Sequence, residues 1–204
     1  LGLMGSGMAM NIMKKHGQLN VFDLDKVAVA QLVASGATQM QSAKELGANS
    51  DIVVLSLPEP SISLAVVLGK EGLIQGLAPG AQVIEMSTDG IEAVRELNEA
   101  LSKHGVGFID CPVGKGPAAA KTGDLRIFAS GDPDVCSSLN WVLSMMGSKV
   151  DHCGPIGAGQ AIKLANNLLS CGYGALISEA YSMAKKAGAN LDIFCDALPQ
   201  TAAN

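Results

Sequence analysis

The segment from Gly157 to Asn167 places two chemically useful side chains one helical turn apart. Its sequence, GAGQAIKLANN, has helical spacing, so Lys163 and Asn167 share one face and have mostly apolar neighbours. Partial burial lowers the pKa of a lysine, and a lowered pKa suits proton transfer near neutral pH. A lysine whose stem snorkels along the helix, with Asn167 as a packing contact, gives the same pattern. Spacing alone favours this second, structural interpretation.

A glycine turn opens the chain. The first residues read LGLMGSGMAMN, and Gly2 and Gly5 fit the second and third glycines of a dinucleotide-binding G-x-G-x-x-G motif. The first glycine of that motif would precede Leu1. A helix then continues to the cations of Lys14-Lys15-His16 and ends at Gly17. The N–H groups and dipole at such a helix start can face a pyrophosphate, although an ordinary strand–turn–helix has similar glycines.

Asp23 lies where a dinucleotide-binding fold needs an acid. It follows the apolar run Leu19-Asn20-Val21-Phe22, about 20 residues after the glycines, and can accept hydrogen bonds from the adenosine ribose hydroxyls. Together the glycines and Asp23 favour dinucleotide binding. A carboxylate repels the 2′-phosphate of NADP, and Leu24 offers no arginine to hold it, so we expect NAD rather than NADP.

A third candidate is the loop-like segment Asp110–Leu125, with the sequence DCPVGKGPAAAKTGDL. It follows a predicted strand, as ligand-binding loops do in open α/β sheets. Its glycines permit a close approach of the backbone, and Lys115 supplies a cation for an acidic substrate group. A flexible surface turn with a solvated lysine explains the same residues equally well.

The elements that must position these residues alternate along the first three quarters of the chain. Apolar, strand-like runs are expected at 19–23, 51–57, 82–87, 106–110, 125–130 and 148–152. Helical patterns are expected at 26–35, 43–46, 60–68, 91–104 and 133–146. Such alternation predicts an α/β fold with a Rossmann-type, doubly wound parallel sheet. After a break at Gly154-Pro155-Ile156-Gly157, a long helical pattern covers 158–187, and a second helix begins near Leu191.

Composition narrows the function classes. Hydrophobic residues make up 48% of the 204 residues and aromatic residues only 3%, which predicts a sizeable aliphatic core. The net charge of −5 argues against a nucleic-acid partner. Five cysteines without a C-x-x-C pair suggest neither a disulfide framework nor a zinc site, so we expect no metal and a reducing compartment. The sequence has no run of about 20 uncharged apolar residues, so we expect no membrane span.

Taken in order, these features resemble the β-hydroxyacid dehydrogenase family, which includes 3-hydroxyisobutyrate dehydrogenase, tartronate semialdehyde reductase and sulfolactaldehyde reductase. The resemblance covers the whole chain and rests on five ordered motifs. They are the glycine turn ending in Met8-Ala9-Met10-Asn11, Leu57-Pro58, Met86-Ser87-Thr88, the Asp110–Leu125 segment and Gly157-x-Gly159-x3-Lys163-x2-Asn166-Asn167. Five ordered motifs are more specific than any one of them, and they favour the chemical interpretation of Lys163.

The resemblance implies a Rossmann domain over 1–155 and, over 156–204, an interdomain helix with the start of an all-α domain. Family chains are longer, so most of that helical domain, with a lysine that closes over the cofactor, would lie beyond Asn204. Members form dimers or tetramers through the helical domain, so we expect a homo-oligomer. The apolar faces of helix 158–187 would stay uncovered without either a partner chain or the missing helices. The expected compartment is the cytoplasm, or the mitochondrial matrix if a targeting segment precedes Leu1.

The resemblance also implies an NAD-dependent oxidoreductase that moves a hydride between the cofactor and a small, anionic β-hydroxyacid. Lys163 would then be the general acid/base on the substrate oxygen. Asn167 would hold the same oxygen or orient Lys163, with Asn166 nearby, and Thr88 would lie near the nicotinamide and the substrate. The residues expected to bind the cofactor are Gly2, Leu3, Met4, Gly5, Asp23, Leu57, Pro58 and Thr88.

One motif departs from the family pattern. Most members have Ser-Gly-Gly after Pro-Val to hold the substrate carboxylate, whereas this chain has Gly114-Lys115-Gly116. Sulfolactaldehyde reductase is similar here, with a glycine followed by an arginine suited to a sulfonate. Lys115 could supply a point charge for a sulfonate, a phosphonate or a second carboxylate, or it could point to solvent. The proline that commonly follows the Ser-Thr pair is also missing from Met86–Gly90, so the local loop could differ in shape.

Three alternatives remain open. An imine reductase shares the architecture but generally has a different residue in place of Lys163. A decarboxylating sugar-acid dehydrogenase of the 6-phosphogluconate type would need phosphate-binding residues and a longer helical domain that are not evident in the sequence. A catalytically inactive NAD(P)-binding scaffold, or a chromatin-associated relative, would not need Lys163 and Asn167, and the chain has no basic tail.

Overall fold

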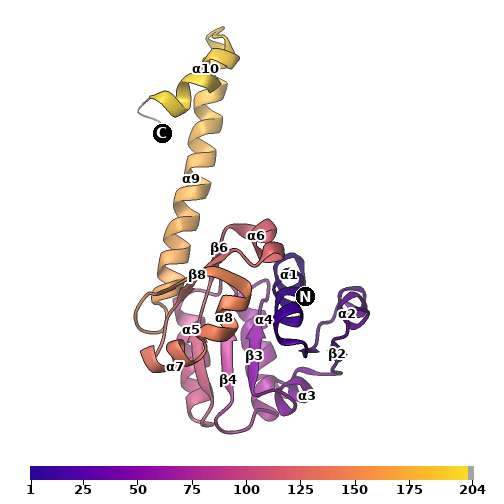
Figure 1. The fold of residues 1–204 in the computed structure, drawn as a ribbon. Helices are drawn as coiled ribbons and strands as arrows, with labels where there is room; N and C mark the ends of the chain where they lie inside the picture. Colours follow the sequence, from indigo (N-terminus) through magenta and orange to yellow (C-terminus); the bar gives the residue numbers. More distant parts are fainter. Residues whose placement is uncertain (202–204) are drawn as a thin grey trace. The chain divides into compact units, whose positions relative to one another are not determined.

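The structure, a computed structural model, describes residues 1–201 and divides into two units, Leu1–Leu164 and Ala165–Asn204. The first unit alternates strands with helices (Figure 1), which confirms the predicted α/β class. Its strands are β1 (Asn20–Val21), β2 (Thr38–Gln39), β3 (Ile52–Leu55), β4 (Gln82–Glu85), β5 (Gly107–Asp110), β6 (Val113–Gly114), β7 (Leu125–Ala129) and β8 (Gly147–His152). Its α-helices are α1 (Leu3–His16), α2 (Lys26–Val33), α3 (Ala43–Ala48), α4 (Pro60–Leu68), α5 (Ile91–Ser102), α6 (Gly116–Thr122), α7 (Pro133–Ser138), α8 (Asn140–Met146) and the start of α9 (Ala158–Lys186). A short 3-10 helix, η1, covers Leu73–Gln75.

The central sheet has the strand order β3-β4-β5, and its pairs are parallel. The register aligns the last residues of the three strands, Leu55, Glu85 and Asp110. β1 and β2 form a separate parallel pair. In the third sheet β7 and β8 are parallel, whereas β6 pairs with β7 in the antiparallel direction, which the sequence did not predict. The carboxyl ends of β3, β4 and β5 therefore meet at one edge.

Helices cover both faces of the central sheet, as expected of a doubly wound fold. Successive residues of a strand point to opposite faces. On β4, Ile84 belongs to the hydrophobic cluster that includes Met8 of α1. Its neighbour Val83 belongs to another cluster, with Val67 of α4 and Leu97 of α5. The sheet is thus held between α1 on one face and α4 and α5 on the other.

Two predicted segments fold differently. The expected loop Asp110–Leu125 contains both β6 and α6, because Pro117 suits the first turn of a helix and Ala118–Ala120 suits its interior. The expected helix 133–146 is interrupted at Leu139, which separates α7 from α8. The segment that follows the predicted substrate loop is therefore helical.

The second unit contains the remainder of α9, the helix α10 (Leu191–Ala197) and the 3-10 helix η2 (Leu198–Gln200). Asn190 caps α10 by accepting hydrogen bonds from the N–H groups of Asp192 and Ile193. Tyr181 and Phe194 pack edge to face, with ring centroids 6.2 Å apart. No helix within residues 1–201 has the length and apolar character needed to cross a membrane. The predicted domain boundary at residue 155 stays a prediction.

Candidate active site

The start of α1 offers backbone N–H groups to a ligand. Among the described residues no side chain caps α1 at Gly2, and its first turn has no acid. Because the first N–H groups of a helix have no partner within it, this 14-residue helix can bind a phosphate group there. A Cβ atom added at Gly2 would meet nothing within 4 Å, and one at Gly5 would lie 3.6 Å from Ser56 Cβ. Packing against other residues therefore does not require these glycines, and their role toward a ligand stays a prediction.

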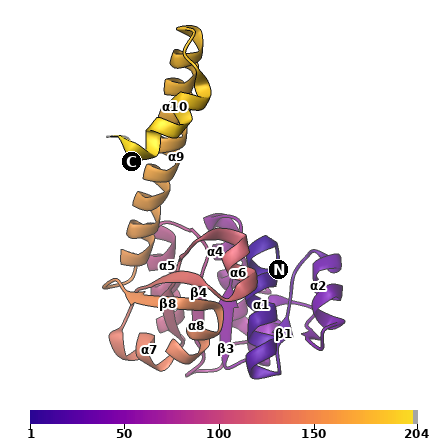
Figure 2. The ribbon, with the colours of Figure 1, turned by 45° about the horizontal axis from the view of Figure 1, so that its top comes forward.

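Gly7 has a different role, which sequence analysis did not identify. A Cβ atom at Gly7 would lie 2.8 Å from the carbonyl carbon of Ala120, so α1 and α6 approach closely only with glycine at this position. Figure 2 shows the two helices side by side. Asn11 Nδ2 also donates to the carbonyl of Ala120 at 2.8 Å. These contacts hold the segment after Lys115 against the helix expected to bind phosphate.

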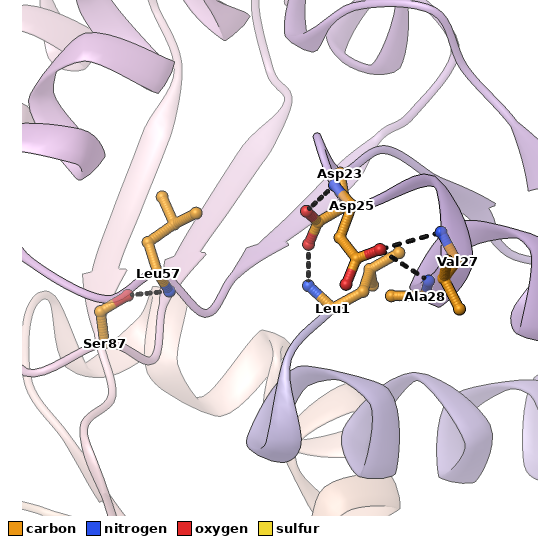
Figure 3. A network of polar contacts seen from close by, with 7 residues as sticks. All are labelled: Leu1, Asp23, Asp25, Val27, Ala28, Leu57 and Ser87. Carbon is orange, nitrogen blue, oxygen red and sulfur yellow. Dashed lines mark hydrogen bonds and ion pairs between the residues drawn. The ribbon is translucent and has the colours of Figure 1, made fainter.

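Asp23 follows β1 and lies beside the start of the chain. Its carboxylate is paired with the amino group of Leu1 and accepts from the N–H of Asp25 at 2.8 Å (Figure 3). Asp25 in turn caps α2, and Leu24 is 88% exposed. An aspartate carboxyl group is ionised near neutral pH, so Asp23 is a hydrogen-bond acceptor near the α1 start.

The loops that follow β3 and β4 are joined by a hydrogen bond. The N–H of Leu57 donates to Ser87 Oγ at 2.7 Å (Figure 3). Ser87 is buried, and its own N–H donates to Glu85 Oε1 at 2.8 Å. Leu57 is half-buried, whereas Pro58 and Thr88 are exposed. The structure thus brings the two predicted cofactor-lining loops together.

A buried polar network fixes the first turn of α9. Asp110 Oδ1 accepts from the N–H of Gly157 at 2.9 Å and from the hydroxyl of Ser130 at 2.6 Å. Ser130 Oγ accepts in turn from the N–H of Gly159 at 3.0 Å. Gly157 has a φ of +94°, and a Cβ atom at Gly159 would lie 2.3 Å from the carbonyl oxygen of Phe128. The two glycines therefore serve the docking of α9 onto β5 and β7.

Gln160 completes this network. Its side chain is fully buried, its Oε1 accepts from the N–H groups of Asp89 at 3.1 Å and Gly90 at 3.3 Å, and its Nε2 donates to the Ser87 carbonyl at 3.1 Å. These bonds tie α9 to the loop that contains Thr88. Sequence analysis assigned no role to Gln160. Its only signal was a polar residue among the small and apolar residues of a helix start.

Lys163 lies about one turn beyond Gln160 on α9 and is half-buried. Burial lowers the pKa of Lys163 below its ordinary value, which is the condition that the proton-transfer hypothesis requires. Asn167 is half-buried and Asn166 is exposed, and both belong to the second unit. Their place beside the substrate oxygen stays a prediction.

Three buried carboxyl groups lie near the carboxyl ends of β4 and β5, namely Glu85, Asp89 and Asp110. Burial, together with the charge of Asp89, raises the pKa of Glu85 to about 8. Burial also raises the pKa of Asp89, although the hydroxyl of Ser63 acts in the other direction. For Asp110, burial raises the pKa against the opposing effect of the Ser130 hydroxyl. Near neutral pH the pair of Glu85 and Asp89 therefore holds a proton.

Lys115 precedes α6 and has a left-handed backbone, with a φ of 75°. Its Nζ donates to Asp124 Oδ2 at 2.9 Å, and both side chains are about half exposed. Hydrogen bonds from Ser148 and Lys115 lower the pKa of Asp124, so that carboxyl group is ionised near neutral pH. Lys115 is thus paired with a carboxylate rather than simply solvated. Its role toward a substrate, and that of Gly114 and Gly116, stays a prediction.

Several of the predicted residues of the first unit are connected along the carboxyl ends of the strands. Leu57 bonds Ser87, Ser87 bonds Gln160, and Gly5 lies beside Ser56. Lys163 lies about one turn beyond Gln160 on α9. Ligands of open α/β sheets bind at this edge. Among residues 1–201, no group of three His, Cys, Asp or Glu side chains could hold a metal ion.

Two family models match this chain. Residues 1–154 match the NAD binding domain of 6-phosphogluconate dehydrogenase. Residues 157–204 match the family described as NAD-binding of NADP-dependent 3-hydroxyisobutyrate dehydrogenase. The two matches fall on the α/β part of the chain and on its last helices.

Named relatives agree with the family models. The NAD-dependent L-serine dehydrogenase of Pseudomonas aeruginosa is 37% identical over 169 residues, which cover 83% of this chain and 57% of that protein. The 3-sulfolactaldehyde reductase of Escherichia coli is 32% identical over 203 residues, which cover 100% of this chain and 68% of that protein. The solved structure of 3-hydroxyisobutyrate dehydrogenase of Mycobacterium tuberculosis with L-serine is 29% identical and has a TM-score of 0.91, over 100% of this chain and 69% of that one.

The chain spans about three fifths of the length of the first curated relatives that it matches. The two matches nevertheless fall on residues 1–154 and 157–204, which contain all five sequence motifs. Residues 1–154 form an NAD(P)-binding domain, and the chain belongs to the β-hydroxyacid dehydrogenase family.

Proposed function

We propose that this protein is an oxidoreductase that transfers a hydride between NAD and a small, anionic β-hydroxyacid or its aldehyde. The observation that carries the proposal is Lys163, a half-buried lysine of lowered pKa on a helix that is bonded to the Thr88 loop. The names of the relatives, an L-serine dehydrogenase and a 3-sulfolactaldehyde reductase, support this class of reaction.

NAD, when bound, accepts or supplies the hydride at its nicotinamide ring. The N–H groups at the start of α1 fit its pyrophosphate, and Gly2 and Gly5 leave room for it. The ionised Asp23 accepts hydrogen bonds from the ribose hydroxyls and disfavours a 2′-phosphate. The remaining cofactor-binding residues of the proposal are Leu3, Met4, Leu57, Pro58 and Thr88.

Lys163 is the general acid/base of the proposed reaction. In reduction its ammonium form donates a proton to the substrate oxygen, and in oxidation its neutral amine accepts the hydroxyl proton. Because burial lowers the pKa of Lys163, more of the neutral amine is present near neutral pH. Oxidation is expected to rise with pH through this pKa, and reduction is expected to fall above it. Asn167 holds the same oxygen or orients Lys163, with Asn166 nearby.

Lys115 supplies the cation for an anionic group of the substrate in this proposal. The flanking Gly114 and Gly116 allow the substrate to approach the backbone. The ion pair with Asp124 is half exposed, so a sulfonate, a phosphonate or a second carboxylate can take the place of that partner. The substrate class is thus a hydroxyacid with a strong or additional anionic group.

We also infer a homo-oligomer, either a dimer or a tetramer. Large apolar side chains of the second unit are exposed, and such surfaces are typical of subunit contacts. They include Leu168, Leu169, Tyr173, Leu176 and Met183. The five cysteines are free thiols, which agrees with the cytoplasm or the mitochondrial matrix as the compartment.

The test is turnover by the full-length protein with 3-hydroxyisobutyrate, glycerate, sulfolactate and 4-hydroxybutyrate, each with NAD and with NADP. We expect oxidation of one of these acids, with kcat/KM about tenfold higher for NAD, because a 2′-phosphate would face the Asp23 carboxylate. Equal rates with both cofactors would contradict the assignment of Asp23. Binding of NAD without turnover of any of the four acids would contradict the proposed reaction.

A further inference from the structure

Gln160 uses both polar atoms of its side chain inside the protein. Its side chain has no exposed surface, its oxygen faces two N–H groups and its nitrogen faces a carbonyl. The opposite orientation of the amide would set donors against donors, so these partners determine which way it points. Each lost bond would leave a buried backbone group without a partner.

The partners of Gln160 flank Thr88 on both sides. The carbonyl belongs to Ser87, and the N–H groups belong to Asp89 and Gly90. Thr88 itself is exposed, so its backbone is held on each side while its side chain remains accessible. Gln160 thus fixes the turn that is expected to lie near the nicotinamide.

Other anchors of the α9 start have different partners. Gly157 bonds Asp110 at the end of β5, and Gly159 bonds Ser130, which follows β7. Of the residues of this first turn, all of which the structure describes, Gln160 alone bonds the loop after β4. Gln160 is therefore the residue of this turn that connects α9 to that loop by hydrogen bonds.

We propose that Gln160 is a positioning residue that sets the place of Lys163 relative to the Thr88 loop. The inference rests on the proposed function, because Lys163 and Thr88 matter together only if a proton and a hydride reach the same substrate. A displacement of about 1 Å in such a site can cost about 100-fold in rate. A loosened α9 start also lets water reach the Lys163 amine.

The test compares Gln160→Met with Gln18→Met in the full-length protein. Methionine fills a similar volume without the three hydrogen bonds, and Gln18 is exposed after α1. We expect Gln160→Met to lower kcat about tenfold or more and to change the KM for NAD less than about threefold. The pH at which oxidation reaches half its maximum is expected to rise, because a more hydrated Lys163 has a higher pKa.

A purely structural role for Gln160 would lower thermal stability without moving the pH profile, and that result would overturn the proposal. The proposal would also be overturned if Gln160→Met had the same kcat and the same pH profile as Gln18→Met. If Gln160→Met does not fold, Gln160→Glu replaces it, because glutamate keeps the acceptor and donates to Ser87 only when it is protonated. An unchanged pH profile in Gln160→Glu would equally overturn the positioning role.

A second readout does not depend on turnover. Acetic anhydride labels neutral lysines, so the extent of labelling across pH reports the pKa of Lys163 against the exposed Lys70. In Gln160→Met, half-labelling of Lys163 is expected at a higher pH, closer to that of Lys70. An unchanged labelling curve overturns the positioning role, whereas absence of turnover in the parent protein overturns only the proposed reaction.

Discussion

Lys115 forms an ion pair with Asp124 on the surface of the first unit. The pair is 2.9 Å long and about half exposed, and such ion pairs are weak in water because solvent screens them. A substrate anion that reaches Lys115 therefore competes with one carboxylate, that of Asp124, which also accepts a hydrogen bond from Ser148. This competition makes both residues of the pair relevant to substrate affinity.

Replacing Lys115 by alanine should raise the KM for the anionic substrate about tenfold, because a charge-assisted contact is lost. Replacing Asp124 by asparagine should lower that KM a few-fold, since the competing carboxylate is gone. Steady-state kinetics of both variants, with Lys121→Ala on α6 as the matched control, tests these expectations. An unchanged KM in Lys115→Ala would mean that this lysine serves only the surface ion pair.

Lys163 and Gln160 lie about one turn apart on α9, but their surroundings could not be predicted equally well from the sequence. The partial burial of Lys163 could be predicted from its apolar neighbours on the helix, and it is found. Its chemical role is favoured by the family resemblance and not by spacing alone, and it stays a prediction. The contacts of Gln160 could not be predicted, because its partners Ser87, Asp89 and Gly90 lie 70–73 residues away. Only the folded chain shows that a distant loop satisfies this amide.

At the scale of elements, the end of β4 joins the sheet to the site. Glu85 is its last residue and aligns with Asp110 on β5, so two acids occupy neighbouring strand ends. Glu85 is also the acceptor for the N–H of Ser87, which starts the Thr88 loop. Because Glu85 is buried at this strand end, its carboxyl group keeps its proton to a higher pH than usual.

The pair of Glu85 and Asp89 makes stability depend on pH. The pKa of Glu85 is raised from 4.5 to about 8, so its contribution to stability is complete below pH 4.5 and is lost as pH rises through 8. The free energy of unfolding should fall by at least about 1 kcal/mol between pH 6 and 9. In Glu85→Gln, whose amide can still accept from Ser87, this fall should be smaller.

Urea unfolding at several pH values gives the slope of the unfolding free energy against pH. It is measured for the parent, for Glu85→Gln and for the exposed control Glu96→Gln on α5. The control should retain the parent slope. Equal slopes in the parent and in Glu85→Gln would show that Glu85 is ionised in the folded protein at pH 7.

Strand and helix alternation could be predicted from the sequence because apolar runs and helical periodicity differ in spacing. The helix α6 could not, since its Gly116-Pro117 start reads as a turn and its partner is the distant Gly7. The two-residue strand β6 is too short for a periodic signal, and its pairing with β7 depends on the chain reversal through α6.

At the scale of the whole molecule, the chain combines an aliphatic core with an uncovered apolar surface. The first unit buries its Val, Ile and Leu side chains in clusters on both faces of the sheet. In the second unit Leu168, Leu176 and Met183 are 74%, 67% and 70% exposed. Apolar surface of this extent favours association with other chains or segments.

The chain of residues 1–204 is therefore expected to self-associate. Leu168→Gln, Leu176→Gln and Met183→Gln, combined, should shift it toward the monomer, whereas Ser170→Gln with Ser182→Gln at exposed positions of α9 should not. Size-exclusion chromatography with light scattering gives the mass of each species. A single sharp monomer peak for the parent chain would contradict this expectation.

Turnover by the Lys163→Ala variant, measured beside NADH binding, is the most direct test of the proposed reaction. On the acid that the parent oxidises, kcat is expected to fall about 10²–10⁴-fold, because the general acid/base is lost. NADH should bind with unchanged affinity, since its expected contacts lie on α1, at Asp23 and in the loops after β3 and β4. A variant that keeps kcat within about threefold of the parent would show that Lys163 does not transfer the proton.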